Sequence, residues 1–130
     1  MPVQTLGHTP LSSDGSNRPL SPAVRAGDFV FVSGQVPLDE TSQVVAGGIA
    51  EQTRQVFRRI EAVLADAGCS LEDVAKATVW LADAKDFRAF NQAYIECFGA
   101  HRPARSTVQA RLMVDALVEI EVIAYKPVTP

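Results

Sequence analysis

The sequence of 130 residues is the size of one domain, and its 47% hydrophobic content predicts a compact core with an apolar surplus that identical subunits would bury between them. The net charge is −3, and the nearest approach to a basic stripe is Arg54, Arg58 and Arg59, so we expect no nucleic-acid partner. Cys69 and Cys97 have no metal-ligand spacing, and no run approaches the ~18 apolar residues of a membrane span. We therefore expect no metal, no membrane partner and a cytoplasmic protein.

Residues 1–130 are interpreted as a single domain that begins with a short edge strand over residues 3–6. Residues 7–22 concentrate Gly, Pro, Ser, Asp and Asn, which predicts a loop or mobile arm. Residues 29–36 read as a buried strand that is interrupted by Ser33 and Gly34. A glycine in such a run permits close approach of a backbone or ligand, although a plain bulge is the commoner cause.

A helix is predicted after the turn-rich segment 37–48. Apolar residues recur at steps of three and four from Val56 to Ala67, which is typical of a helix that packs one face on a sheet. Gly68 is placed where helices commonly end.

A strand over residues 74–82 and a second helix follow. Asp83 is the expected cap of this helix, Gly99 its end, and Phe87, Phe90, Tyr94, Ile95 and Phe98 its apolar stripe. Asn91 lies on the same stripe. We expect it to be structural, as a hydrogen-bonded core amide that ties the helix to a strand.

Two strands, over residues 104–111 and 117–125, are expected to form an antiparallel hairpin. The resulting fold class is α+β, a two-layer sandwich in which two helices cover one face of a mixed sheet. The other face still carries apolar side chains, either Val118, Ile120 and Val122 or their neighbours, and a partner subunit would cover it.

Arg105 is the strongest candidate in this segment for a role in binding or catalysis. Strand alternation places it on one face with Thr107, Gln109 and Arg111. A positive charge on a largely apolar strand needs an anion, because burying it unpaired costs free energy. Spacing alone leaves two possibilities open: a carboxylate ligand that matches the guanidinium fork, or an internal salt bridge.

Glu119 and Glu121 share one face of a strand rich in β-branched residues. A half-buried carboxylate there can orient water or exchange a proton, or both acids can pair with Arg105 or Arg111 as structural ions. In the predicted hairpin Arg105 lies opposite Ile123, about 13 Å along the strand from Glu119. A shared site would then need a bulge or a neighbouring subunit.

Other catalytic patterns are weak in this sequence. His8 and His101 have no acid and nucleophile nearby in sequence, so no triad is indicated. No glycine-rich loop follows a strand in the pattern that binds phosphate, and we therefore expect no nucleotide cofactor.

The segment PARSTVQARLMVDALVEIEVIA resembles the signature of the reactive-intermediate deaminases, the Rid or YjgF family, also labelled L-PSP endoribonucleases. Further similar segments are FVFVSGQVPLD, GCSLEDVAKATVWLAD and DFRAFNQAYIECF. The similarity runs from about Pro19 to Lys126, which is nearly the whole domain.

This resemblance implies a chorismate-mutase-like α+β fold, assembled as a homotrimer whose sheets form a central barrel with three clefts between subunits. It also implies a reaction that uses no cofactor. The reaction is hydrolysis of 2-imino acids such as 2-iminopropanoate and 2-iminobutanoate, and of their enamine tautomers, to 2-keto acids and ammonia. The partner would be a small imino or keto acid.

The resemblance also assigns site residues. Arg105 would clamp the substrate carboxylate, and Glu119 would orient the attacking water or relay a proton to the departing nitrogen. Thr107 stands where members often have cysteine, and its backbone would help hold the imine. Gly34, beside Ser33, would let the backbone approach the ligand.

One segment departs from the family pattern. Archetypal members have a tyrosine after a Gly-Pro pair, whereas this chain reads Ser21-Pro22-Ala23. The expected cleft would thus lack an aromatic wall and a hydroxyl, and a larger substrate could fit. Asn91 matches a family asparagine that we interpret as scaffold.

Three alternatives to the leading interpretation stay open. The same chemistry could act on 3-aminoacrylate or an aminomuconate-like acid. A non-catalytic sensor or regulatory protein could bind a carboxylate metabolite in the same cleft. An endoribonuclease ranks lower, because a net charge of −3 and the lack of a histidine pair suit RNA cleavage poorly.

Overall fold

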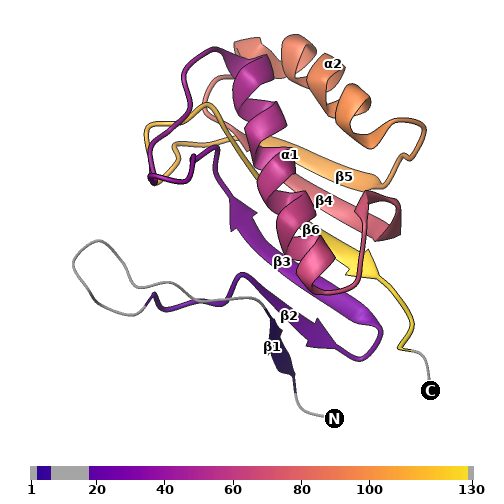
Figure 1. The fold of residues 1–130 in the computed structure, drawn as a ribbon. Helices are drawn as coiled ribbons and strands as arrows, with labels where there is room; N and C mark the ends of the chain where they lie inside the picture. The colour runs from indigo at the N-terminus through magenta and orange to yellow at the C-terminus, as the bar shows by residue number, and fades with distance from the viewer. Residues whose placement is uncertain (1–2, 7–17, 129–130) are drawn as a thin grey trace.

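The structure is a computed structural model that describes residues 3–6 and 18–128. Its described elements are β1 (Gln4–Leu6), β2 (Ala23–Ala26), β3 (Phe29–Gln35), α1 (Ile49–Asp66), β4 (Val74–Leu81), α2 (Phe87–Phe98), β5 (Ala104–Gln109) and β6 (Val118–Tyr125). Both α-helices lie on one face of the sheet (Figure 1), which confirms the predicted α+β sandwich. Of the predicted loop 7–22, residues 7–17 lie outside the described residues, and 18–22 form neither helix nor strand.

The described residues form one six-stranded sheet in the order β1-β2-β3-β6-β4-β5. Strands β4 and β5 pair in parallel, and the other neighbours pair antiparallel. The predicted hairpin between the last two strands is therefore wrong, because β6 inserts between β3 and β4. The chain reaches β5 from β4 through α2, and a helical crossover of this kind is what a parallel pair requires.

The helix boundaries follow local signals. Gly68 (φ +76°) comes just after the residue that caps α1, and Gly99 (φ +68°) caps α2. Both have a positive φ, a conformation that residues with a Cβ atom adopt reluctantly. Asp83 caps a short 3₁₀ turn that precedes α2, because its carboxylate accepts a hydrogen bond from the amide of Lys85 at 2.9 Å. The predicted cap is thus real, although α2 itself begins at Phe87.

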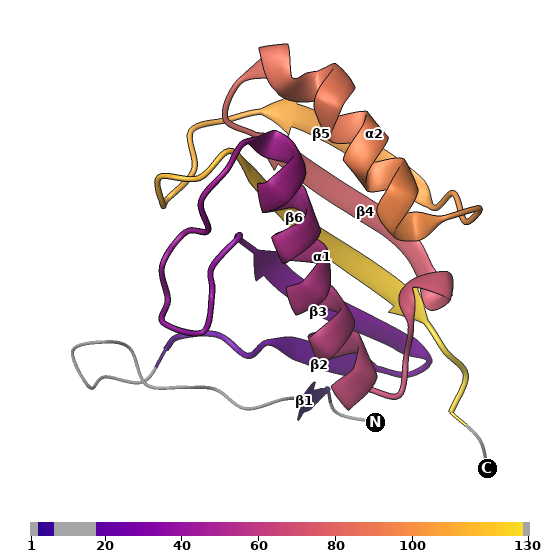
Figure 2. The same ribbon diagram turned by 45° about the horizontal axis from the view of Figure 1, so that its top comes forward.

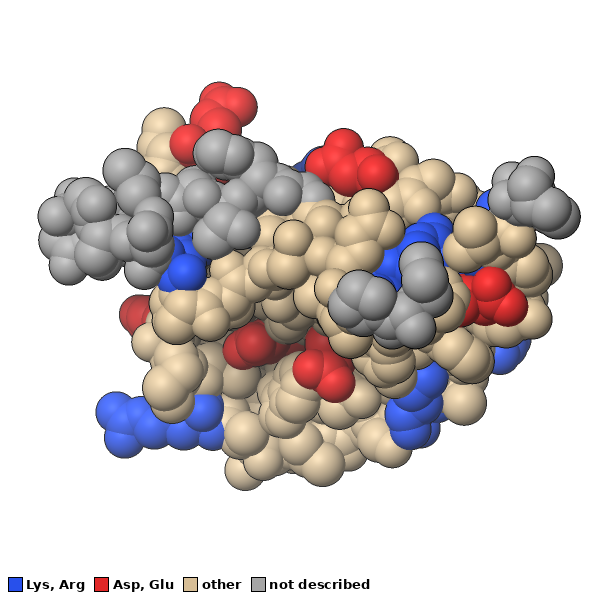
Figure 3. Space-filling view, turned by 90° about the horizontal axis from the view of Figure 1, so that it is seen from below, with Lys and Arg blue, Asp and Glu red and all other residues tan. Residues whose placement is uncertain are grey.

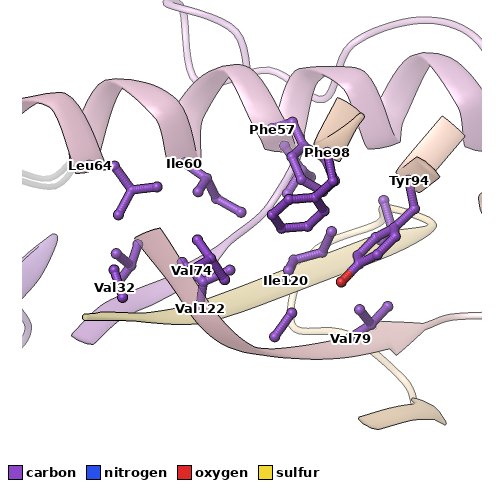
Figure 4. Packing of buried hydrophobic residues seen from close by; sticks show 14 of the residues in the cluster. Val32, Phe57, Ile60, Leu64, Val74, Val79, Tyr94, Phe98, Ile120 and Val122 are labelled. Atoms are coloured by element: carbon purple, nitrogen blue, oxygen red, sulfur yellow. The ribbon is translucent and has the colours of Figure 1, made fainter. Parts of the chain in front are cut away.

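The core lies between the helices and the sheet. Figure 4 shows Phe57, Ile60 and Leu64 of α1 directed toward the strands, where they meet side chains such as Ile120 and Val122. These five side chains are all at most 1% exposed. Figure 2 shows α1 and α2 side by side over this face of the sheet.

The opposite face of the sheet is apolar and lacks a covering layer in the described part of the chain. Strand alternation directs Phe29, Phe31 and Tyr125 away from the helices, and their exposures are 43%, 41% and 46%. The rings of Phe29 and Tyr125 contact each other edge to face at 5.2 Å between centroids. Figure 3 views the molecule from below and shows mostly uncharged atoms, with acidic groups near the centre. Among the described residues, no helix is both long and apolar enough to cross a membrane.

Candidate active site

Arg105 lies on β5, the outermost strand beside β4, and its side chain turns toward α2. Its guanidinium carbon is 4.7 Å from the ring centroid of Tyr94, 5.6 Å from that of Phe90 and 5.7 Å from that of Phe87. Aromatic faces attract a cation at this distance. The three rings recur at helical spacing on α2, so residues that the sequence predicted as core also orient the arginine.

Within residues 3–6 and 18–128, Arg105 forms no ion pair with a carboxylate. The internal salt bridge that spacing left open, including pairs with Glu119 or Glu121, is therefore not formed there. A half-buried guanidinium held on aromatic rings keeps its hydrogen-bond donors for another anion.

Two buried hydroxyls lie near this arginine. Thr107 Oγ1 and Tyr94 Oη have no hydrogen-bond partner among the described residues. Burial raises the pKa of Tyr94, and the positive charge of Arg105 acts in the opposite direction. Figure 4 shows the Tyr94 hydroxyl directed toward the sheet on the side of Val79, which pairs with Thr107. Thr107 and Phe87 also line a hollow of about 270 Å³.

Glu119 lies on β6 with its side chain on the face that the helices leave bare. Burial raises the pKa of this carboxyl, and the negative charge of Glu121 raises it further. No basic side chain in the described part of the chain counters this shift. The group can therefore accept and return a proton nearer to neutral pH than an exposed glutamate can.

Gly34 lies against Glu119. A Cβ atom at position 34 would overlap the Glu119 carboxylate oxygen Oε2, so this contact requires a residue without a side chain. The β3–β6 register shifts between Val32 and Gln35, which is the irregularity that a glycine inside the strand suggested. Ser33 donates its hydroxyl to the Ser21 carbonyl at 2.6 Å, so this side chain fixes the segment before β2.

One chain does not bring Arg105 and Glu119 together. Arg105 pairs with Ala77 of β4, and Ala77 pairs with Val122 of β6. Glu119 is therefore two strands away, about 10 Å across the sheet, and about 10 Å further along its strand. Alternation also sends the two side chains to opposite faces. The predicted separation holds, although the hairpin used to estimate it does not.

Ala23, which the sequence comparison placed at the family tyrosine of the cleft wall, is a core residue in the structure. Ala23 is 1% exposed, because it begins β2 on the helix-covered face and packs in the core. Its methyl group packs in the core, although the residue also borders a hollow lined by Phe31 and Glu121. Leu20, which also follows a proline, is 53% exposed and lines a hollow together with Gly34.

Two other expectations concern Asn91 and metal ions. Asn91 is half-buried, and it makes no side-chain hydrogen bond to the described residues, so its structural role stays a prediction. No group of three or more His, Cys, Asp or Glu side chains in the described ranges is placed to hold a metal ion.

Comparison with known proteins identifies a family and several relatives of this chain. The family model named Endoribonuclease L-PSP matches residues 12–126. A RutC family protein of Pyrococcus abyssi is 50% identical over 110 residues, covering 83% of this chain and 87% of that protein. The 3-aminoacrylate deaminase RutC of Acinetobacter baylyi is 46% identical (82% and 86% covered), and the human 2-iminobutanoate/2-iminopropanoate deaminase is 38% identical (85% and 82%).

Solved structures show the same fold. The crystal structure of yeast Mmf1 superposes with a TM-score of 0.87 at 35% identity, covering 96% of this chain and 99% of that chain. The family match spans most of the sequence, and two curated relatives are named deaminases. The chain therefore belongs to the L-PSP endoribonuclease family, also called the Rid or YjgF family.

Proposed function

We propose that this protein hydrolyses 2-imino acids, such as 2-iminopropanoate and 2-iminobutanoate, and their enamine tautomers to 2-keto acids and ammonia. The observation that carries the proposal is Arg105, a guanidinium held on three aromatic rings with no carboxylate paired to it among the described residues. Relatives named as deaminases for this class of compound support it.

The proposed reaction depends mainly on the orientation of substrate and water, because the C=N carbon is already electrophilic. Arg105 holds the substrate carboxylate, and Glu119 accepts a proton as water adds to the electrophilic C=N carbon. Glu119 returns this proton to the carbinolamine nitrogen, which leaves as ammonia with the C–N bond electrons, while the hydroxyl loses its proton to water and becomes the keto group. No electrons are gained or lost overall, so the reaction consumes only the imine and water.

We further propose that a homotrimer performs this reaction, with the bare sheet faces inside and each cleft built from two subunits. Two features support this assembly: the exposed aromatic face, and the placement of Arg105 and Glu119 on opposite sides of one sheet. In this arrangement Thr107 and Arg105 come from one protomer, and Glu119 and Gly34 from its partner. We place the trimer in the cytoplasm, where free thiols such as Cys69 persist.

The test measures keto acid and ammonia released from 2-iminobutanoate that a dehydratase generates in situ. The wild type should accelerate release. Arg105→Ala should lose about 2 kcal/mol or more of transition-state stabilisation, because this is the typical contribution of a hydrogen bond to a charged group. Arg88→Ala, which removes an exposed arginine from α2, serves as the matched control. Equal rates for wild type and Arg105→Ala would reject the proposal.

Substrate choice within this chemistry is open to direct comparison. Rates on 3-aminoacrylate and on an aminomuconate-like acid, measured beside 2-iminobutanoate, identify the preferred compound.

A non-catalytic sensor is the second candidate function. Leu20 favours it, because this exposed residue in the hollow beside Gly34 has no hydroxyl. A non-catalytic sensor would bind keto acids saturably at Arg105 without turnover. An endoribonuclease, suggested by the family's name, would cleave RNA at low salt and lose this activity with Arg105→Ala.

A further inference from the structure

A hollow of about 270 Å³ lies between α1, the end of β3 and the segment that precedes β2, and its lining includes Gly34, which contacts the proposed catalytic glutamate. Its polar lining includes the side chains of Arg18 and Arg59, and its apolar lining includes Leu20 and Val63. No aspartate or glutamate is among the described residues that line it. The size is close to that of small-ligand sites, and the charge of the lining favours an anion.

Arg59 is held in place by neutral groups. Its Nε donates to Gln35 Oε1 at 3.2 Å, and one terminal nitrogen donates to the Leu38 carbonyl at 3.3 Å. A guanidinium has five N–H donors, so these two hydrogen bonds leave about three for other acceptors. Arg59 forms no ion pair with any carboxylate of the described residues.

The charge balance around Arg59 is unfavourable without a ligand. Burial lowers the pKa of Arg59, and the positive charge of Arg18 lowers it further. Two arginines that line one hollow repel each other, and an anion between them would offset this repulsion and the cost of burying Arg59.

The hollow adjoins the proposed reaction site at a single residue. Gly34 borders the hollow, and the same residue is the backbone against which Glu119 packs. Gly34 lies near the end of β3, so a substrate whose C=N carbon lies near Glu119 on the bare face would pass round this end of the strand to reach Arg59 on the helix side. The apolar side chain of Leu20 would contact the carbon chain between the two ends.

We propose that Arg59 and Arg18 form a second anion subsite that binds the distal carboxylate of a substrate whose first carboxylate is held by Arg105. The preferred substrate class would then be imino or enamine dicarboxylates. This inference rests on the proposed function, because it assigns the far end of the substrate in the same cleft. Arg59 acts as a specificity-determining residue.

The experiment compares two imines of equal chain length, 2-iminopentanedioate and 2-iminopentanoate, each generated in situ by an amino-acid oxidase. The wild type should have the higher kcat/KM for the dicarboxylate. Arg59→Met should lower the ratio of the two kcat/KM values by roughly ten- to a hundredfold, mainly through the dicarboxylate KM, because a charge-assisted hydrogen bond is lost. Arg59→Lys keeps the charge and should restore part of the preference.

Arg58→Met is the matched control, because Arg58 is the exposed neighbour on α1 and donates only to Gln55 among the described residues. It should leave the ratio unchanged. If Arg59→Met slowed both imines by the same factor, Arg59 would be structural and the subsite would be rejected. Thermal unfolding of each variant shows whether it is folded.

Failure of the proposed function gives a different pattern. If the wild type hydrolyses neither imine, calorimetric titration with 2-oxopentanedioate and 2-oxopentanoate still tests the subsite. Tighter binding of the dicarboxylate that is lost in Arg59→Met supports it, and equal binding of the two acids overturns it. If the wild type hydrolyses both imines without preference, the subsite is wrong and the deaminase proposal stands.

Discussion

The two halves of the candidate site differ in how the fold holds them. Arg105 lies on the edge strand β5 and contacts three aromatic rings of α2, and these contacts orient its guanidinium group. Glu119 lies on the central strand β6 beside Gly34, which has no side chain, and burial raises the pKa of the Glu119 carboxyl. Neither has an oppositely charged partner in the described part of the chain. In the proposed assembly, each protomer would therefore contribute two separate halves, each to a different site.

The strongest test of this division is Glu119→Gln. If Glu119 moves the proton, kcat should fall by about 10²–10⁴-fold, the range for general acid–base groups, and KM should change little because Arg105 is the proposed carboxylate-binding residue. Steady-state kinetics on 2-iminobutanoate measure both values. Glu40→Gln, at an exposed position, is the control. Retention of wild-type kcat by Glu119→Gln would contradict the assignment.

Mixing two inactive variants sharpens the comparison further. Arg105→Ala and Glu119→Gln, unfolded and refolded together, should regain activity in about a quarter of their sites, because a cyclic trimer then contains clefts with both native residues. Each variant refolded alone should stay inactive. No recovery in the mixture would place both residues in the same protomer's site.

Gly34→Ala should disturb the glutamate half alone. The added Cβ overlaps the Glu119 carboxylate, and a displacement of this kind costs about 10²-fold in rate. Stability should change little, because the flexible end of Glu119 can move aside. Gly48→Ala is the matched control, since a Cβ there meets nothing within 4 Å. Equal rates for the two variants would show that the Gly34–Glu119 contact is not needed for turnover.

The bare face should govern assembly rather than folding of the protomer. Phe31→Ser removes an exposed ring from this face, and burial of such a ring between subunits is worth about 1.5–3 kcal/mol per subunit. Light scattering over a dilution series should show the variant trimer dissociating at higher concentration than the wild type. Val128→Ser is the control, at an exposed position after the end of β6. Unchanged dissociation would remove this face from the interface.

The smallest expected effect concerns pH. The Glu119 pKa is raised in the folded state, so its contribution to stability is present below the ordinary glutamate pKa and is lost as pH rises through the raised value. Glu121→Gln removes the second cause and should move the acid limb of the kcat profile to lower pH. A profile that does not move, or moves to higher pH, would show that the two acids do not interact.

Much of the fold follows from sequence pattern, because local signals determine its elements. Apolar residues at every third or fourth position predicted α1, and Gly68 marked its end. Strand alternation predicted that Arg105 and Thr107 share one face. The short strand β2 was missed, since four residues carry little pattern.

Strand order could not be derived from the same signals. A short connection between two strands predicts a hairpin, but the parallel β4–β5 pair and the insertion of β6 depend on contacts far apart in sequence. For the same reason, the sequence predicted Arg105 and Glu119 as candidates but not their opposite faces. The aromatic support of Arg105 was visible as a stripe on α2, although nothing in the stripe indicated a cation above it.

The central place of β6 has a consequence for synthesis of the protein. Strands β1 to β3 and the β4–β5 pair have no contact through the sheet until residues 118–125 join them. A nascent chain on the ribosome would thus expose two unfinished sheet edges until residues 118–125 emerge. The strand that closes the sheet also carries Glu119, so the fold and the proposed glutamate half of the site would be completed in one step.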